Sequence, residues 1–325
     1  MHMVKFIRSV KFRVLSARIV AAAMLAACAA AFGAHSAGAA PITLGTASNY
    51  GLLLGTKETL TLSGGLSVSG NVGVGASDAV SISGSSAIGG TVYEDSGVTS
   101  SGSGSAAISG GVVTQSMTSI ISAAASASTS AAALTATSGL TDQGGSISLN
   151  NASVTIKALT NLSENVLDIS ALSLTNGTLT FDDNGFTGAK FIINVTGAFS
   201  VGNNAIIKGI NGASGADIIF NIEGTNGSAV SLTGNSSTSI IGTILAPQRS
   251  VTLGGGGSLT GALIAGVNNA GKSYTVTEGS GGYNITGLGY TPRTVVNTPE
   301  PSSLAILGAG MLALFGIRRR PRQQH

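Results

Sequence analysis

The sequence is poor in the residues that most enzymes use for catalysis. It has no tryptophan, one cysteine (Cys28) and three histidines, which are His2, His35 and His325. A single cysteine cannot form an intramolecular disulfide, so stability must come from packing and backbone hydrogen bonds. With histidine and cysteine confined to the ends, the central chain cannot assemble Ser-His-Asp or Cys-His machinery, or a zinc site with such ligands. We therefore predict no enzyme, no cofactor and no metal.

Charged residues are also scarce, at 9% of 325 residues, whereas hydrophobic residues reach 43%. This balance argues against intrinsic disorder, because enough apolar surface remains to bury a core. The formal charge of +3 reflects 16 basic and 13 acidic residues. Nine of the basic residues lie at the two ends, so the centre is acidic. Nucleic-acid binding, which needs a basic patch on a folded face, is excluded.

The N-terminus has the three parts of a secretion signal: a basic start, the apolar stretch Ile19–Ala34, and small residues. Ala37 and Ala39 form a signal peptidase site, which predicts cleavage after Ala39 and a mature chain that begins at Ala40. An alternative remains open, because the four residues that end at Cys28 resemble a lipobox and would make Cys28 a lipidated N-terminus.

The C-terminus also has three parts, in the order Pro299-Glu300-Pro301, the apolar run Leu304–Ile317, and an arginine cluster. Together they resemble the PEP-CTERM sorting signal that exosortases process. As a helix the run rises only ~21 Å, which is short of the ~30 Å hydrocarbon core. This length suits a transient stop better than the alternative, a permanent membrane helix. By the positive-inside rule, the residues that would stay cytoplasmic are Arg318, Arg319, Arg320 and Arg322.

The resemblance implies a signal peptidase and an exosortase as partners. It also implies an inner-membrane intermediate, and then the cell surface or extracellular matrix of a Gram-negative bacterium. We expect a signal peptide at 1–39, a body at 40–290, a linker at 291–298, and a sorting signal at 299–322 with a transmembrane helix at 304–317.

Between the ends, apolar residues alternate with Ser and Thr in short runs that stop at Gly or Asn. A period of two with turn residues at both ends is typical of strands. The strands are short and the aromatics few, which favours a mainly β fold, an irregular β-solenoid, over a sandwich. No fixed repeat length is evident. The clearest expected strands are at 60–63, 66–69, 80–83, 153–156, 172–175 and 179–181.

One segment breaks this pattern. Residues 115–137 contain no Gly or Pro and are rich in Ala, with apolar residues near helical spacing. We predict one long helix packed alongside the β body, capped by Thr114 or Ser116 and ended by Gly139.

Two further motifs have ordinary explanations. The acidic cluster at 182–185 ends in Asn-Gly, which is typical of a turn. The four glycines at 254–257 lack the Lys and Ser/Thr of a phosphate loop, so a corner between strands explains them better.

Segments 44–50, 242–247 and 261–266 resemble two groups of proteins: the bacterial ice-binding domain and the choice-of-anchor-A adhesin-like domain. Segments 192–195 and 219–221 are more similar to the second. The resemblance to the ice-binding domain implies an irregular β-solenoid with one long helix alongside. Together the two resemblances imply a structural or adhesive surface protein linked to extracellular polysaccharide or biofilm, with ice binding as the alternative. For that alternative, the candidate ice-face residues are Thr59, Thr61, Thr275 and Thr277. Thr-x-Thr pairs are also common in ordinary strands, and two pairs alone make no array.

Overall fold

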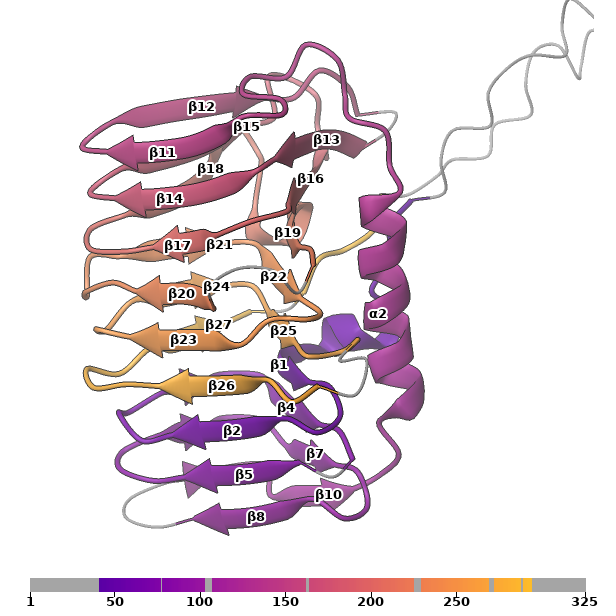
Figure 1. The fold of residues 1–325 in the computed structure, drawn as a ribbon, viewed down its shortest axis with the longest axis vertical. Helices are drawn as coiled ribbons and strands as arrows, with labels where there is room; N and C mark the ends of the chain where they lie inside the picture. Colours follow the sequence, from indigo (N-terminus) through magenta and orange to yellow (C-terminus); the bar gives the residue numbers. More distant parts are fainter. Residues whose placement is uncertain are drawn as a thin grey trace, which may run out of the picture. The chain divides into compact units, whose positions relative to one another are not determined.

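The chain winds into coils, each of which contributes one strand to each of three parallel sheets. The computed structural model describes residues 41–293 except 77, 103–106, 162–163, 225–228, 269–271 and 288. These residues belong to one compact unit, Ala39–Thr294. Each sheet has nine strands, and every strand pair is parallel. The predicted β-solenoid is thus confirmed, with the coils stacked as in Figure 1.

Except at its exposed end strand, Val112–Thr114, sheet A is buried on both faces, which explains why its strands read as nearly continuous apolar runs. One face lines the bore of the solenoid and the other faces the helix. In stacking order it consists of β10 (Val112–Thr114), β7 (Val92–Glu94), β4 (Asn71–Val74), β1 (Tyr50–Leu54), β25 (Leu263–Ala265), β22 (Thr243–Ala246), β19 (Ile218–Ile222), β16 (Lys190–Val195) and β13 (Glu164–Ile169).

Sheet B has one apolar face in the bore and one face toward solvent, which gives the alternation seen in the sequence. It consists of β11 (Ser146–Asn150), β14 (Ala171–Thr175), β17 (Phe199–Val201), β20 (Val230–Thr233), β23 (Val251–Gly254), β26 (Thr275–Glu278), β2 (Thr59–Leu62), β5 (Ala79–Ile82) and β8 (Thr99–Gly102).

Sheet C completes each coil and leads back into sheet A. Its outer face is more varied than that of sheet B and includes Lys157, Lys208 and Ile210. It consists of β12 (Ser153–Lys157), β15 (Thr178–Asp182), β18 (Ile206–Ile210), β21 (Ser239–Ile241), β24 (Ser258–Thr260), β27 (Asn284–Thr286), β3 (Ser67–Val68), β6 (Ala87–Ile88) and β9 (Ala107–Ile108).

The coils are not stacked in the order of the sequence. The first coil, β1 to β3, pairs with the last, β25 to β27. Helix α2 (Thr118–Ala132) runs along the outside of sheet A and connects β10, at one end of the stack, with β11, at the other end (Figure 1). Two short 3-10 helices complete the fold, η1 (Gly45–Asn49) and η2 (Gly215–Asp217).

The helix is shorter than the predicted range 115–137 at both ends. The N–H of Gln115 donates to the carbonyl of Glu94, so the chain is still paired with β7 there. Neither Thr114 nor Ser116 caps the helix; the N-cap is Met117, whose N–H donates to Asp95 Oδ2 at 3.0 Å. The helix ends well before Gly139, because the N–H of Thr137 already donates to the carbonyl of Val166 in β13.

The six expected strands and the expected turns are confirmed. Asn184 and Gly185 lie in a turn after β15, and both have positive φ. Gly255 forms the corner after β23, where a Cβ would lie 1.6 Å from the carbonyl oxygen of Gly234. The interpretation of both segments as turns therefore agrees with the structure.

The expectation of irregular coils is wrong for the first three coils. Adjacent coils there repeat every 20 residues, as in the pairs Glu58 with Asp78 and Asn71 with Thr91. The coils after the helix vary in length: paired residues are 25 positions apart between β11 and β14, 31 between β17 and β20, and 19 between β22 and β25.

The outer face of sheet B as a candidate functional site

The outer face of sheet B carries an unbroken row of hydroxyl side chains, one from each strand. In eight of the nine strands the two residues that flank the ladder residue are buried, which leaves the ladder residue pointing outward. In β8 the ladder residue Ser101 is exposed. The register pairs these outward residues strand by strand. In stacking order the hydroxyl ladder is Ser148, Ser173, Ser200, Ser231, Thr252, Thr277, Thr61, Ser81 and Ser101.

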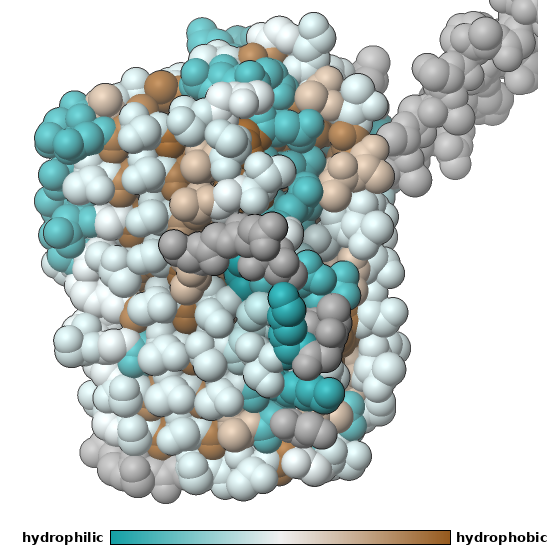
Figure 2. Space-filling view, in the orientation of Figure 1, coloured by the Kyte–Doolittle hydropathy of each residue, from teal (hydrophilic) through white to brown (hydrophobic). Residues whose placement is uncertain are grey.

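Small residues border the ladder. On one side Thr59 pairs with both Thr275 and Ala79, and Ala79 pairs with Thr99. On the other side Thr233 pairs with Gly254. We call the ladder and these neighbours the hydroxyl face. Figure 2 shows it as a pale surface with brown between the pale side chains, and the strongly hydrophilic teal gathers at its margins.

The four predicted ice-face residues come together at the centre of this face. Thr59 lies opposite Thr275, and Thr61 lies opposite Thr277, across the junction between the first and last coils. Residues more than 200 positions apart in the sequence thus form a block of four threonines. Neighbouring parallel strands are about 4.8 Å apart, so the block continues the spacing of the ladder.

Seven of the nine ladder residues were missed by the sequence reasoning. Three ladder positions, Thr61, Ser81 and Ser101, follow the 20-residue repeat of the first coils. That repeat was the available signal, and exchange among Ser, Thr and Ala hides it. The later positions had no such signal, because their coils differ in length.

The described strands of the hydroxyl face present no charged side chain to solvent. Among the described residues of the nine strands, the only charged side chain is Glu278, which is 1% exposed. Phe199 is their only aromatic residue, and it is also buried. The face therefore offers hydroxyl groups, methyl groups and backbone, without charge and without rings.

The described residues show no cluster of metal-ligating side chains. Within the described part of the chain, no three His, Cys, Asp or Glu side chains lie together as metal ligands would. In the same residues no helix is long and apolar enough to span a membrane.

The other predicted sites fall outside the described residues. These are the signal peptidase site at Ala37 and Ala39, Cys28, the sorting motif Pro299, Glu300 and Pro301, the helix at 304–317, and the arginines Arg318, Arg319, Arg320 and Arg322.

Comparison with protein families gives two matches. The ice-binding-like adhesive domain family matches residues 30–285, and the PEP-CTERM protein-sorting motif matches residues 297–320. The chain belongs to the ice-binding-like adhesive domain family. It ends in a PEP-CTERM sorting motif, which directs export through membrane-associated sorting to the cell surface. No match to the curated proteins is found.

Solved structures with a similar fold are ice-binding proteins. One from an Antarctic biological consortium has a TM-score of 0.53 and 19% identity, over 78% of this chain and 94% of that one. One from the Antarctic ascomycete Antarctomyces psychrotrophicus has a TM-score of 0.48 and 18% identity, over 76% and 98%. One from Shewanella frigidimarina has a TM-score of 0.47 and 17% identity, over 78% and 99%. At such identities the likeness concerns the fold alone.

Proposed function

We propose that this chain is an adhesive protein on the surface of a Gram-negative bacterium and that it binds extracellular polysaccharide through the hydroxyl face. The observation that supports this most directly is the ladder of nine hydroxyl residues, one per strand. A polysaccharide presents hydroxyl groups at a repeating distance, and the strands present theirs about every 4.8 Å. A row of matched contacts follows from the two periodicities.

The strength of such binding would come from number rather than from any one contact. A net hydrogen bond contributes about 0.5–1.5 kcal/mol, and the face has no ring for stacking against a sugar. Several ladder positions engaged together, on many copies at one cell surface, would raise the avidity. A neutral polymer suits this face better than an acidic one, because the body as a whole is acidic.

A second candidate ligand is ice, and the block of Thr59, Thr61, Thr275 and Thr277 favours it. Threonine offers a methyl group beside each hydroxyl, and here four of them lie in register on a flat sheet. In the sequence the two Thr-x-Thr pairs are far apart, which argued against an ice-binding array. In the structure the pairing of β2 with β26 brings them together, which weakens that argument. Polysaccharide remains our first proposal, because serine predominates along the rest of the ladder.

Export and processing belong to the same proposal. We expect signal peptidase to release a mature chain at Ala40, and an exosortase to remove the tail after the Pro299-Glu300-Pro301 region.

The first prediction tests the hydroxyl face with a double substitution. Thr61→Tyr with Thr277→Tyr places two rings on paired ladder positions, which should block the face while suiting a strand. We expect binding of residues 40–296 to matrix polysaccharide from the source organism to weaken roughly tenfold, which corresponds to about 1.4 kcal/mol. Co-sedimentation at several polymer concentrations measures it.

The matched control is Thr260→Tyr with Thr286→Tyr, a pair of exposed threonines in register on sheet C. It should change the affinity less than twofold. The same three proteins are to be frozen into slowly grown ice. Equal polysaccharide binding by both variants contradicts the proposal, and faceted ice growth that only the sheet B variant loses would favour ice as the ligand.

A further inference from the structure

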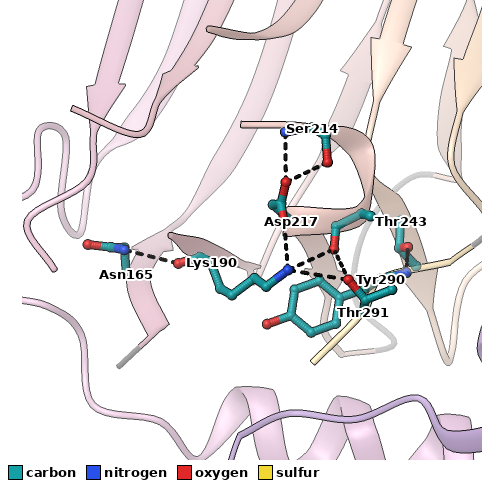
Figure 3. A network of polar contacts seen from close by, with 8 residues as sticks. Asn165, Lys190, Ser214, Asp217, Thr243, Tyr290 and Thr291 are labelled. Atoms are coloured by element: carbon teal, nitrogen blue, oxygen red, sulfur yellow. Dashed lines mark hydrogen bonds and ion pairs between the residues drawn. The ribbon is translucent and has the colours of Figure 1, made fainter. Parts of the chain in front are cut away.

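A buried ion pair lies at the corner of the solenoid where sheet C leads into sheet A. Lys190, the first residue of β16, places its Nζ 2.5 Å from Asp217 Oδ1, and the two side chains are 8% and 13% exposed. Figure 3 shows Lys190 extended toward Asp217 and Thr291. A buried pair needs further hydrogen bonds to offset the loss of hydration. Thr291 accepts one from Lys190, and Ser214 donates to Asp217.

Each member of the pair is fixed by the chain around it. Ser214 donates to Asp217 Oδ2 through its N–H at 2.9 Å, which is one half of the capping box of η2, and also through its hydroxyl. Asn165 Nδ2 donates to the carbonyl of Lys190 at 3.1 Å. The pair is therefore a rigid point in the wall of the solenoid.

The last described residues of the chain are bound to this point. Lys190 Nζ donates to Thr291 Oγ1 at 3.3 Å, and the Thr291 N–H donates to the carbonyl of Ala216 at 3.0 Å. Tyr290 is fully buried; its ring centre is 5.5 Å from Lys190 Nζ, and its N–H donates to Thr243 Oγ1 at 2.7 Å. The segment that leads toward the sorting motif is thus held by β16, η2 and β22.

The N-terminal end of the body is held next to the same corner. The N–H of Ile42 donates to Glu164 Oε1 at 3.4 Å. Glu164 begins β13 and lies opposite Lys190 in the register of sheet A. Both ends of the described chain therefore leave from one edge of the solenoid.

This corner lies across the coil from the hydroxyl face. Each coil passes from sheet A to sheet B to sheet C and back to sheet A. The corner between C and A is the one that sheet B does not touch. Thr291 and Pro299 are eight positions apart, so Pro299 can lie at most about 29 Å from Thr291.

We propose that Lys190, Asp217, Thr291 and Tyr290 form a clasp that holds the start of the segment between the body and the sorting motif. The hydroxyl face then points away from the surface to which that segment is attached. The inference rests on the proposed function, because it takes sheet B as the binding face. A pull on the tail then acts on interior strands of sheet A rather than on an edge. Behind the clasp, β27 is held between β24 and β3, so the chain resists a pull at two successive points.

The test is single-molecule pulling on residues 40–298, which contain the whole compact unit. One handle is attached at Ser81→Cys on the hydroxyl face, since the only native cysteine lies in the predicted signal peptide, and the other follows residue 298. At constant force, Lys190→Met should release the segment around Thr291 roughly tenfold faster than the parent protein. Lys208→Met, an exposed lysine of sheet C, is the matched control and should leave the release rate unchanged.

A second variant covers the case in which Lys190→Met does not fold. Thr291→Val keeps the size of the side chain and removes only its hydroxyl contact, and it should also speed release, by a smaller factor. Release rates that equal those of the Lys208→Met control in both variants would overturn the clasp. Polysaccharide binding is measured in parallel, without force, on a parent protein that keeps Ser81 and carries no handle: absence of binding rejects the proposed function, while the force result still decides whether the clasp exists.

Discussion

At the scale of single residues, two buried carboxyl groups stand out because no basic side chain among the described residues forms an ion pair with them. Glu58 and Asp78 are 2% and 3% exposed and occupy equivalent positions on adjacent coils. The N–H of Glu58 donates to Asp78 Oδ1 at 2.7 Å. Burial raises the pKa of Glu58 to about 8, and the nearby Asp78 adds to the rise. Burial raises the pKa of Asp78 to about 7, although backbone N–H donors oppose the rise.

These shifts make the folded state bind protons more tightly than the unfolded chain. Between the ordinary carboxyl pKa near 4 and the raised values, the free energy of unfolding should fall as the pH rises. The fall is at most about 1.4 kcal/mol per pH unit for each group. Well above pH 8 both groups are charged, and no further loss is expected from them.

A substitution at Glu58 tests this dependence. Glu58→Gln stays neutral at every pH, so the loss of stability between pH 5 and pH 8 should be smaller than in the parent protein. Urea unfolding at pH 5, 7 and 9 measures it. Asp142→Asn, at an exposed carboxyl with positive φ that asparagine tolerates, is the control and should keep the parent slope. An unchanged slope in Glu58→Gln would show that this carboxyl is not the cause.

At the scale of elements, the sequence predicts the strands and turns well and the ends of the helix poorly. Period-two alternation is a local property, so runs such as 172–175 identify β14 directly. The start of α2 depends on Asp95, a residue of another coil, 22 positions before the Met117 N–H that it binds. The pairing of Thr59 with Thr275 likewise depends on how the coils stack, which local patterns do not encode.

Asparagines of sheet A attach the helix to the solenoid. Asn194 and Asn221 lie opposite each other on β16 and β19. Asn194 Nδ2 donates to the carbonyl of Ala131, and Asn221 exchanges hydrogen bonds with Ser128: its Oδ1 accepts from the hydroxyl at 2.6 Å and its Nδ2 donates to the carbonyl at 3.2 Å. Asn221 also donates to Asn194 Oδ1 at 3.0 Å. These bonds satisfy polar groups inside an otherwise apolar contact.

Removing one of these amides should loosen the helix. Asn221→Ala leaves the buried hydroxyl of Ser128 and the amide oxygen of Asn194 without this partner, at a cost of about 1–3 kcal/mol. Hydrogen exchange should speed up first in the last two turns of α2, which the measurement resolves by peptide. Asn284→Ala, at an exposed position of sheet C, should change neither stability nor exchange by a measurable amount. Uniform acceleration across all coils would mean that Asn221 acts on global stability instead.

At the scale of the whole molecule, the order of the coils makes this solenoid more cooperative than a linear repeat array. In a linear array each repeat touches only its sequence neighbours, so one end can unfold alone. Here the first coil is enclosed between the last coil and the second. One hydrophobic core runs through all the coils and joins Leu60 of the first to Val276 of the last. The helix adds a second core along sheet A, to which both halves of the chain contribute.

This arrangement predicts a single unfolding transition, which a substitution at the junction of the two halves should lower as a whole. Leu60→Ala removes a fully buried side chain beside Val276 and should cost about 2–5 kcal/mol. Ile193→Ala, far from the junction on β16, should cost a similar amount and shift the same transition. Urea unfolding followed by circular dichroism, with hydrogen exchange of peptides from both halves, measures the effect. Because the first coil has the last coil as its neighbour, the first three coils cannot all lose their packing without exposing the last coil. Unfolding of residues 50–116 in a separate transition before the later coils would contradict this account. It would show that the protein unfolds as a linear solenoid does.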